Sequence, residues 1–195
     1  MGKIFYLMGK SASGKDSIYK KLISDSDLSL VGVVMYTTRP MREGEVDGRD
    51  YFFIDNEELD RLRGEGKVIE ERTYNTMHGP WTYATVDDGQ IDLSKGSYLI
   101  VGVLSSYIET CRFFGKEAIV PVYVEVEDGE RLFRALKRER AGNGKYKELC
   151  RRFLADSEDF SEDKLLGAGI EKKYDNIDFD ACIRQIKDDI RKNDL

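Results

Sequence analysis

Apolar and polar positions alternate along the chain in blocks that predict strands and helices in turn. The first block, residues 4–8, is wholly apolar, and similar runs follow at residues 30–35, 98–104 and 119–124. Such near-continuous runs are typical of strands buried on both faces of a parallel sheet. Most segments between them repeat apolar residues at helical spacing. This order predicts an α/β fold in which helices flank both sides of a parallel sheet.

The polar stretches place the ends of the expected helices. Asp55 or Asn56 is suited to cap a short helix, because either side chain can accept a hydrogen bond from a first-turn amide. The Gly-rich residues 141–144 interrupt a longer helical pattern, and a last edge strand is expected within residues 170–177. The predicted helices cover residues 17–23, 56–64, 105–114, 128–140, 145–166 and 179–191.

Residues 36–97 depart from this alternation. The segment 36–50 is polar and rich in Gly and Arg, which predicts a loop that leaves the core. Strand patterns then follow at residues 51–54, 68–70 and 81–86. We therefore expect a small β-rich insertion between core elements.

Length and charge narrow the class of protein. The 195 residues can build one sizeable core, and 31 basic against 37 acidic side chains leave a net charge of −6. This balance argues against a nucleic-acid partner. No apolar run reaches membrane-spanning length and no signal-peptide pattern is present, so we expect a soluble, cytoplasmic protein with no membrane partner. The oligomeric state is left open.

Cysteine and histidine usage excludes several chemistries. Cys111, Cys150 and Cys182 are scattered and odd in number, which argues against a disulfide framework or a zinc site and favours a reducing compartment. His78 is the only histidine, so histidine metal clusters and Ser-His-Asp catalysis are excluded.

The turn after the first strand has the G-x-x-x-x-G-K spacing of a phosphate-binding P-loop. Gly9 and Gly14 let the backbone curl so that successive N–H groups point into one concavity, and the next helix directs the positive end of its dipole there. Lys15 adds a charge that can reach the outer phosphates of a nucleoside triphosphate. The predicted triphosphate-binding residues are Gly9, Lys10, Ser11, Ala12, Ser13, Gly14, Lys15, Asp16 and Ser17.

One position of this motif differs from the usual pattern. A P-loop has Ser or Thr after the lysine as a magnesium ligand, whereas this chain has Asp16 there and Ser17 next. A carboxylate is also a hard oxygen ligand. We therefore expect Asp16 to contact Mg²⁺ directly or through water, and the site to depend on the metal more than usual.

A second anion site is predicted in the polar loop. Arg39 and Arg42 lie three residues apart, with Pro40 stiffening the backbone between them. Two guanidinium groups held in this way suit a doubly charged phosphate ester, and Tyr51 can add a neutral donor. The alternative is a solvated charged loop.

The two motifs together resemble guanylate kinase. The likeness is carried by the P-loop and by the run Thr37-Thr38-Arg39-Pro40-Met41-Arg42-x-Gly44-Glu45-x-x-Gly48-x-Asp50-Tyr51-x-Phe53, and it extends over nearly the whole chain. It implies phosphoryl transfer from ATP to GMP, and to dGMP, with Mg²⁺. It also implies one domain over residues 1–195, with a core of residues 1–35, 98–136 and 167–195, a GMP-binding insertion at 36–97 and a helical lid at 137–166.

The resemblance assigns roles to residues of the insertion. Arg39, Arg42 and Tyr51 match residues that hold the GMP phosphate, and Thr38 belongs to the same motif. Glu70 matches a glutamate that reads guanine. One carboxylate can accept from both the ring N–H and the amino group of guanine, a pair that adenine does not offer. Tyr83 and Thr85 correspond to a tyrosine and a small hydroxyl residue that complete this pocket.

The resemblance also assigns residues to the lid and to the ATP site. Arg138 and Arg152 match lid arginines, which with Lys15 would neutralise charge on the transferred phosphoryl group. Asn176 follows the last expected strand, either near the ATP base or as a turn residue. The family usually carries acidic residues at the end of the central strand, where this chain has the sequence Val101-Gly102-Val103-Leu104-Ser105.

Two other functions stay open. Ribose bisphosphate phosphokinases resemble guanylate kinases and often carry Gly-Lys-Asp in the P-loop, as Gly14, Lys15 and Asp16 do here. A non-catalytic guanylate-kinase-like module would bind protein partners, but such modules typically lose the P-loop lysine, which this chain keeps.

Overall fold

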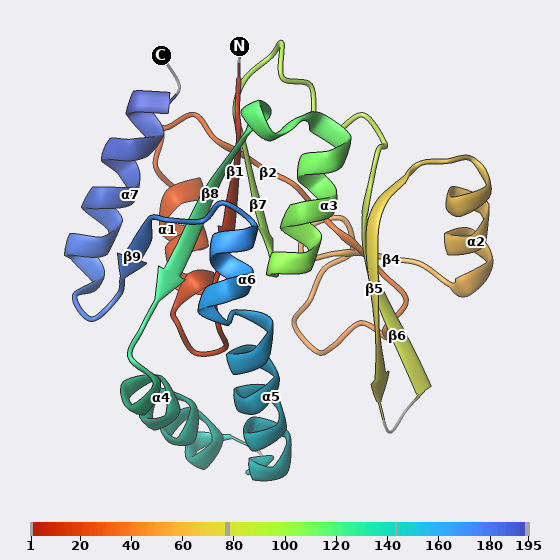
Figure 1. The fold of residues 1–195 in the computed structure, drawn as a ribbon. Coiled ribbons are helices and arrows are strands. Elements are labelled where there is room, and N and C mark those ends of the chain that lie inside the picture. Colours follow the sequence, from red (N-terminus) through yellow and green to blue (C-terminus); the bar gives the residue numbers. More distant parts are fainter. Residues whose placement is uncertain (1, 77–78, 143, 194–195) are drawn as a thin grey trace.

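The computed structural model describes residues 2–76, 79–142 and 144–193. Its core is a parallel sheet with the strand order β2-β7-β1-β8-β9, in which every neighbouring pair runs parallel. Helices cover both faces of this sheet, as Figure 1 shows, which confirms the predicted fold class. The strands are β1 (Ile4–Met8), β2 (Val31–Gly32), β7 (Tyr98–Gly102), β8 (Ile119–Glu125) and β9 (Lys173–Asp175).

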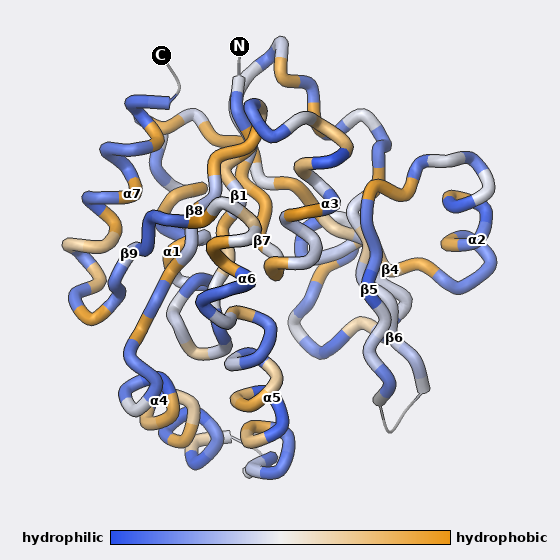
Figure 2. The backbone as a smooth tube through the Cα atoms, in the orientation of Figure 1, coloured by the Kyte–Doolittle hydropathy of each residue, from blue (hydrophilic) through white to orange (hydrophobic). Residues whose placement is uncertain are grey.

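The central strand β1 divides the core into two halves. All five of its side chains are buried. Phe5 and Leu7 pack with α1 (Lys15–Ile23) and α7 (Phe179–Asn193) on one face. Ile4, Tyr6 and Met8 pack on the other face, with α3 (Leu104–Phe114) and α6 (Glu162–Gly167). Figure 2 accordingly shows hydrophobic positions concentrated in the central strands.

A second, four-stranded sheet of order β4-β3-β6-β5 lies beside the core (Figure 1). Its strands are β3 (Tyr36–Thr37), β4 (Phe52–Phe53), β5 (Val68–Thr76) and β6 (Gly79–Val86). The sheet is mixed, because β3 pairs parallel with β4 and antiparallel with β6. Helix α2 (Asn56–Gly64) packs Leu59 and Leu62 against it, and the Asp55 side chain caps that helix by accepting from the Glu58 amide.

A helix pair, α4 (Asp128–Ala141) and α5 (Tyr146–Asp159), extends from the core beyond the P-loop end of β1. The prediction of one helix over 145–166 is wrong, because the chain breaks at Phe160 and restarts as α6. Phe160 is buried and stacks on Tyr123, with ring centroids 5.6 Å apart, so core packing separates the two helices.

The predicted strand over 30–35 is also wrong in part. Only Val31 and Gly32 pair with the core sheet, and the chain reaches the second sheet at Tyr36. Between them the Gln90 side chain accepts from the Val34 amide and donates to the Val34 carbonyl. A side-chain amide thus replaces a neighbouring strand at this position.

The ends of the remaining elements agree with the pattern to within a few residues, except that β5 continues six residues beyond the predicted end at Glu70. Phe160 and Leu165, which fall in the range expected for the lid, belong to the core cluster. The division into core, insertion and lid stays a prediction. Among the residues that the structure describes, no helix combines the length and the apolar character needed to cross a membrane.

Candidate active site

The P-loop forms a tight turn between β1 and α1. Ala12 and Gly14 have positive φ angles of 64° and 90°, and the Ser13 amide donates to the Lys10 carbonyl over 3.1 Å. A Cβ atom on Gly9 would lie 2.5 Å from the Val124 carbonyl oxygen, so β8 leaves room only for glycine there. Helix α1 begins at Lys15 directly after this turn. The positive end of the helix and the loop amides therefore face the same space.

Asn176 supports the P-loop from the end of β9. Its side chain is buried, and Nδ2 donates to the Ser13 carbonyl over 2.7 Å. A Cβ atom on Gly14 would lie 2.4 Å from the same nitrogen. From α4, the Arg134 guanidinium donates to the Asn176 carbonyl over 3.0 Å. Asn176 is thus a structural partner of the loop, a role that neither sequence alternative included.

A cavity of about 230 Å³ opens above this loop. Its floor includes Lys15 and the exposed residues Asp16 and Ser17. The structure therefore brings two of the three residues predicted to be catalytic, Lys15 and Arg138, to one cavity. The full set of lining residues is Ala12, Gly14, Lys15, Asp16, Ser17, Arg134 and Arg138.

Arg152 lies in a neighbouring, smaller hollow that Arg138 also lines. Its guanidinium forms ion pairs with Glu139 at 3.9 Å and Glu148 at 3.6 Å. The Nε atom is buried and has no hydrogen-bond partner among the described residues. In this structure Arg152 is therefore beside the P-loop cavity and not in it.

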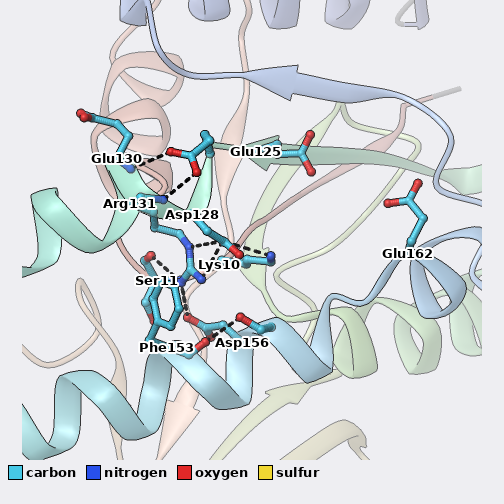
Figure 3. A network of polar contacts seen from close by, with 12 residues as sticks. Lys10, Ser11, Glu125, Asp128, Glu130, Arg131, Phe153, Asp156 and Glu162 are labelled. Atoms are coloured by element: carbon cyan, nitrogen blue, oxygen red, sulfur yellow. Dashed lines mark hydrogen bonds and ion pairs between the residues drawn. The ribbon is translucent and has the colours of Figure 1, made fainter.

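A polar network joins the P-loop to α4 and α5 (Figure 3). Asp156 of α5 accepts a 2.7 Å hydrogen bond from the Ser11 amide and pairs with Arg131 at 3.3 Å. Arg131 is 1 % exposed, binds Asp128 at 2.9 Å and lies 4.1 Å from the ring centre of Phe153. Arg131 and Asp156 were missed from the sequence, where both look like charges on solvated helices.

The predicted acceptor-phosphate residues gather on the second sheet and its loop. Arg39 is buried and makes a two-pronged ion pair with Glu45, with N–O distances of 2.7 and 2.6 Å. The hydrogen bond from Glu45 raises the pKa of Arg39 against the opposing effect of burial. The Arg39 Nε is buried and has no hydrogen-bond partner among the described residues. Arg42 is exposed at the loop surface, and its amide donates to Glu45.

Tyr51 packs against both Arg39 and Tyr83. The Arg39 guanidinium lies 5.0 Å from the Tyr51 ring centre, and Tyr83 packs edge-on against Tyr51 at 5.6 Å. Burial raises the pKa of Tyr51, with Tyr83 and the P-loop residue Asp16 acting in the same direction.

Glu70, on β5, is 4 % exposed. Its carboxylate accepts from the Thr85 hydroxyl over 2.7 Å and pairs with Arg72 at 3.1 Å. The Thr38 hydroxyl accepts from the Thr82 amide of the neighbouring strand β6. The sequence reading missed Arg72. Residues i and i+2 of a strand share one face, so Arg72 would have been expected beside Glu70 if the strand had been predicted to continue. The strand was instead predicted to end at Glu70.

The residues at the P-loop cavity fit a magnesium ion held jointly with phosphate. Mg²⁺ is usually bound by one or two carboxylates together with substrate phosphates and waters. Asp16 is the one carboxylate that lines this cavity among the described residues. The described ranges contain no cluster of three or more His, Cys, Asp or Glu side chains suited to hold a metal without a ligand. His78 lies outside the described residues.

A parallel core sheet with a P-loop and its lysine is the arrangement of the P-loop phosphotransferase class, and arginines and tyrosines cluster on the second sheet. A family model described as guanylate kinase matches residues 1–89. Guanylate kinase from Anaplasma phagocytophilum is 28 % identical over 197 aligned residues, covering 97 % of this chain and 84 % of that protein. The chain is thus similar to guanylate kinases in sequence and in fold.

Other relatives match over shorter segments. Guanylate kinase from Rhodopirellula baltica is 32 % identical over 102 residues, and that from Novosphingobium aromaticivorans is 48 % identical over 61. These alignments span 48 % and 27 % of the two relatives' lengths. The chain therefore matches about half or less of the length of each relative. A crystal structure of guanylate kinase from A. phagocytophilum matches the fold with a TM-score of 0.71 at 22 % identity, over all of this chain and 87 % of that one.

Proposed function

We propose that this protein transfers the terminal phosphoryl group of ATP to GMP, giving ADP and GDP, and that it also accepts dGMP. The observation that carries the proposal is the combination in one fold of a P-loop cavity with Lys15 and a second cluster of Arg39, Tyr51 and Tyr83, with a buried carboxylate at Glu70. Similarity to guanylate kinases supports the same reaction.

The P-loop residues would bind ATP through their amides and through the charge of Lys15. Phosphoryl transfer needs little covalent chemistry from the protein, so catalysis consists of positioning the two phosphates and neutralising charge. Lys15 and Arg138 line one cavity and are suited to that task. Arg152 would join them only after α5 moves relative to α4, and the lid at 137–166 is proposed on that basis.

Asp16 would hold Mg²⁺ together with the ATP phosphates. The metal, when bound, neutralises phosphate charge and orients the transferred group. Because Asp16 is itself negative, triphosphate binding without the metal is opposed by repulsion. Calorimetry of ATP binding with and without magnesium would measure this dependence. Asp16→Ser should reduce it.

The acceptor GMP would bind with its phosphate at Arg39, Arg42 and Tyr51 and its base at Glu70. Arg39 is already oriented by Glu45, so binding does not have to order that side chain. Thr85 donates to Glu70 and fixes one carboxylate oxygen. Tyr83 and Thr38 would complete the walls between phosphate and base.

A panel of acceptors tests the assignment. ATP and magnesium are supplied with GMP, dGMP, AMP, UMP or ribose bisphosphate, and ADP release is followed. We expect turnover with GMP and dGMP. Turnover of the sugar bisphosphate alone would replace guanylate kinase activity by the related phosphokinase activity. If calorimetry detected no ATP binding at millimolar nucleotide, a non-catalytic binding module would be the better description.

A further inference from the structure

Arg72 is a largely enclosed cation next to the residues proposed to bind the guanine base. Its side chain is 16 % exposed. It touches Glu70 through Nη1 at 3.1 and 3.2 Å, and its guanidinium lies 5.8 Å from the ring centre of Tyr83. Arg72 thus adjoins residues that the proposed function assigns to the base pocket.

A buried guanidinium has a large desolvation cost, so its presence there calls for a compensating role. Burial alone would lower the pKa of Arg72, but the charge of Glu70, with those of Tyr6 and Tyr74, raises it instead. Nη1 also contacts the Ser106 hydroxyl of α3 at 2.5 Å. Two elements, β5 and α3, therefore hold the guanidinium in one position.

The donors of Arg72 are not all used by strong acceptors. Nη1 is shared between Glu70 and Ser106, whereas Nη2 faces the Met35 sulfur at 4.0 Å. Thioether sulfur is a weak acceptor. A ligand oxygen that replaced this contact would therefore gain a charge-assisted hydrogen bond and lose little.

The edge of guanine matches this pair of side chains. It presents two donors, the ring N1–H and the 2-amino group, beside one acceptor, the 6-oxo oxygen. Glu70 can accept from the donors, and a guanidinium is the group most often paired with the O6 side of guanine. Adenine presents a 6-amino donor instead, which would face the donors of Arg72.

We propose that Arg72 is a specificity-determining residue that donates to the 6-oxo group of the acceptor base while Glu70 accepts from N1–H and the 2-amino group. This inference rests on the proposed GMP kinase function. It explains how the pocket can select guanine although Val101 to Ser105 provide no acidic side chain. Arg72 would thus distinguish the 6-oxo acceptor of guanine from the 6-amino donor of adenine.

Base analogues separate the two side chains. The substrate 6-thio-GMP keeps N1–H and the 2-amino group but replaces the 6-oxo oxygen by the weaker acceptor sulfur. IMP keeps the 6-oxo oxygen and lacks the 2-amino group. We expect wild-type kcat/KM to be about tenfold lower for 6-thio-GMP than for GMP, as for the loss of one good hydrogen bond to a charged group.

The Arg72→Met variant should lose about tenfold in kcat/KM with both GMP and IMP and should discriminate less than about twofold between GMP and 6-thio-GMP. If Arg72 merely positioned Glu70, the variant would lose the preference for GMP over IMP and keep the preference for oxygen over sulfur. That second pattern would overturn the proposal. Arg63→Met is the matched control, because Arg63 is an exposed, ion-paired arginine that contacts Glu71 of the same strand.

Calorimetry distinguishes failure of this inference from failure of the proposed function. If the wild-type protein binds GMP about tenfold more tightly than 6-thio-GMP but transfers no phosphoryl group, kinase activity is refuted and the role of Arg72 is supported. Equal affinity for GMP and 6-thio-GMP overturns the role of Arg72, whether or not Arg72→Met folds. Absence of GMP binding overturns both.

Discussion

Arg39 combines a two-pronged ion pair with a buried donor that has no partner among the described residues. Both of its terminal nitrogens bind Glu45, and the buried Nε has no hydrogen-bond partner among the described residues. An arginine held in this way presents charge to a phosphate without having to lose side-chain freedom on binding. Glu45 would then act as a positioning residue for the acceptor phosphate.

Lys15→Ala should reduce kcat by about a hundredfold or more, because the charge directed at the transferred phosphoryl group is lost. The melting temperature should change little, since Lys15 lies at the cavity and outside both core clusters. Turnover assays and thermal unfolding measure the two effects. Lys20→Ala, an exposed lysine on the same helix, serves as the control and should leave both unchanged.

Arg42→Ala should raise the KM for GMP by about tenfold with a smaller effect on the KM for ATP, because one charged contact to the acceptor phosphate is removed. Steady-state kinetics with each substrate varied in turn will show the difference. Arg49→Ala is the matched control, since Arg49 is exposed in the same loop and pairs with Asp50. An unchanged KM for GMP would remove Arg42 from the acceptor site.

At the level of elements, Arg131 joins three segments that are distant in sequence. It links α4 to α5 through Asp156 and to the P-loop through the Ser11 carbonyl, at 3.3 and 3.4 Å. Breaking a buried pair by removing one partner costs more than deleting a surface pair, because the other charge is left without compensation. The arrangement of α5 against the P-loop therefore depends on this side chain.

Arg131→Met should lower the free energy of unfolding by about 3 kcal/mol, since Asp156 loses its buried partner. Urea denaturation measures the change, and Asp156→Ala with the double variant gives the coupling between the two residues. Arg151→Met, an exposed ion-paired arginine on α5, should cost less than about 1 kcal/mol. An equally small loss for Arg131→Met would show that the pair does not hold the helices together.

Local patterns predicted most elements, and two of the wrong predictions have a common cause. Periodicity detects one face of a strand or helix, but the strand at 30–35 was shortened by Gln90 and the helix at 145–166 was divided by the burial of Phe160 against Tyr123. Both contacts join segments distant in sequence. A single sequence does not show which distant side chain will compete for a backbone segment.

The roles of the candidate site residues stay predictions. Motif spacing selected Lys15 and Arg39 as candidates because their surroundings are local, as in a P-loop or a turn. Arg72, Arg131 and Asp156 are charged residues in segments where solvated charges are the ordinary expectation, and only the packing of different elements shows that they are enclosed. Buried charges of this kind are found from structure and not from periodicity.

For the molecule as a whole, ion-paired carboxylates determine the response to acid. Hydrogen bonds from arginine lower the pKa of Glu45, Glu58 and Glu148 below the ordinary value of 4.5. A lowered pKa in the folded state adds stability above the unfolded value, and that stability is lost as the pH falls towards the folded value.

We therefore expect a melting temperature that is nearly constant from about pH 7 to about pH 5 and falls progressively below about pH 4.5. Differential scanning calorimetry across this range measures it. Glu148→Gln should make the melting temperature fall less steeply with decreasing pH, because one fewer carboxyl group takes up a proton on unfolding. A melting temperature maintained down to about pH 3 would contradict the assignment of these shifts.

The bond between Asn176 and the Ser13 carbonyl has a consequence for the order in which the protein matures. The two residues are 163 positions apart, so the turn gains this support only after the chain through Asn176 has left the ribosome. A nascent chain stalled before β9 should bind ATP weakly even though every residue of its glycine-rich turn is already made. Nucleotide affinity would then report that synthesis has passed β9.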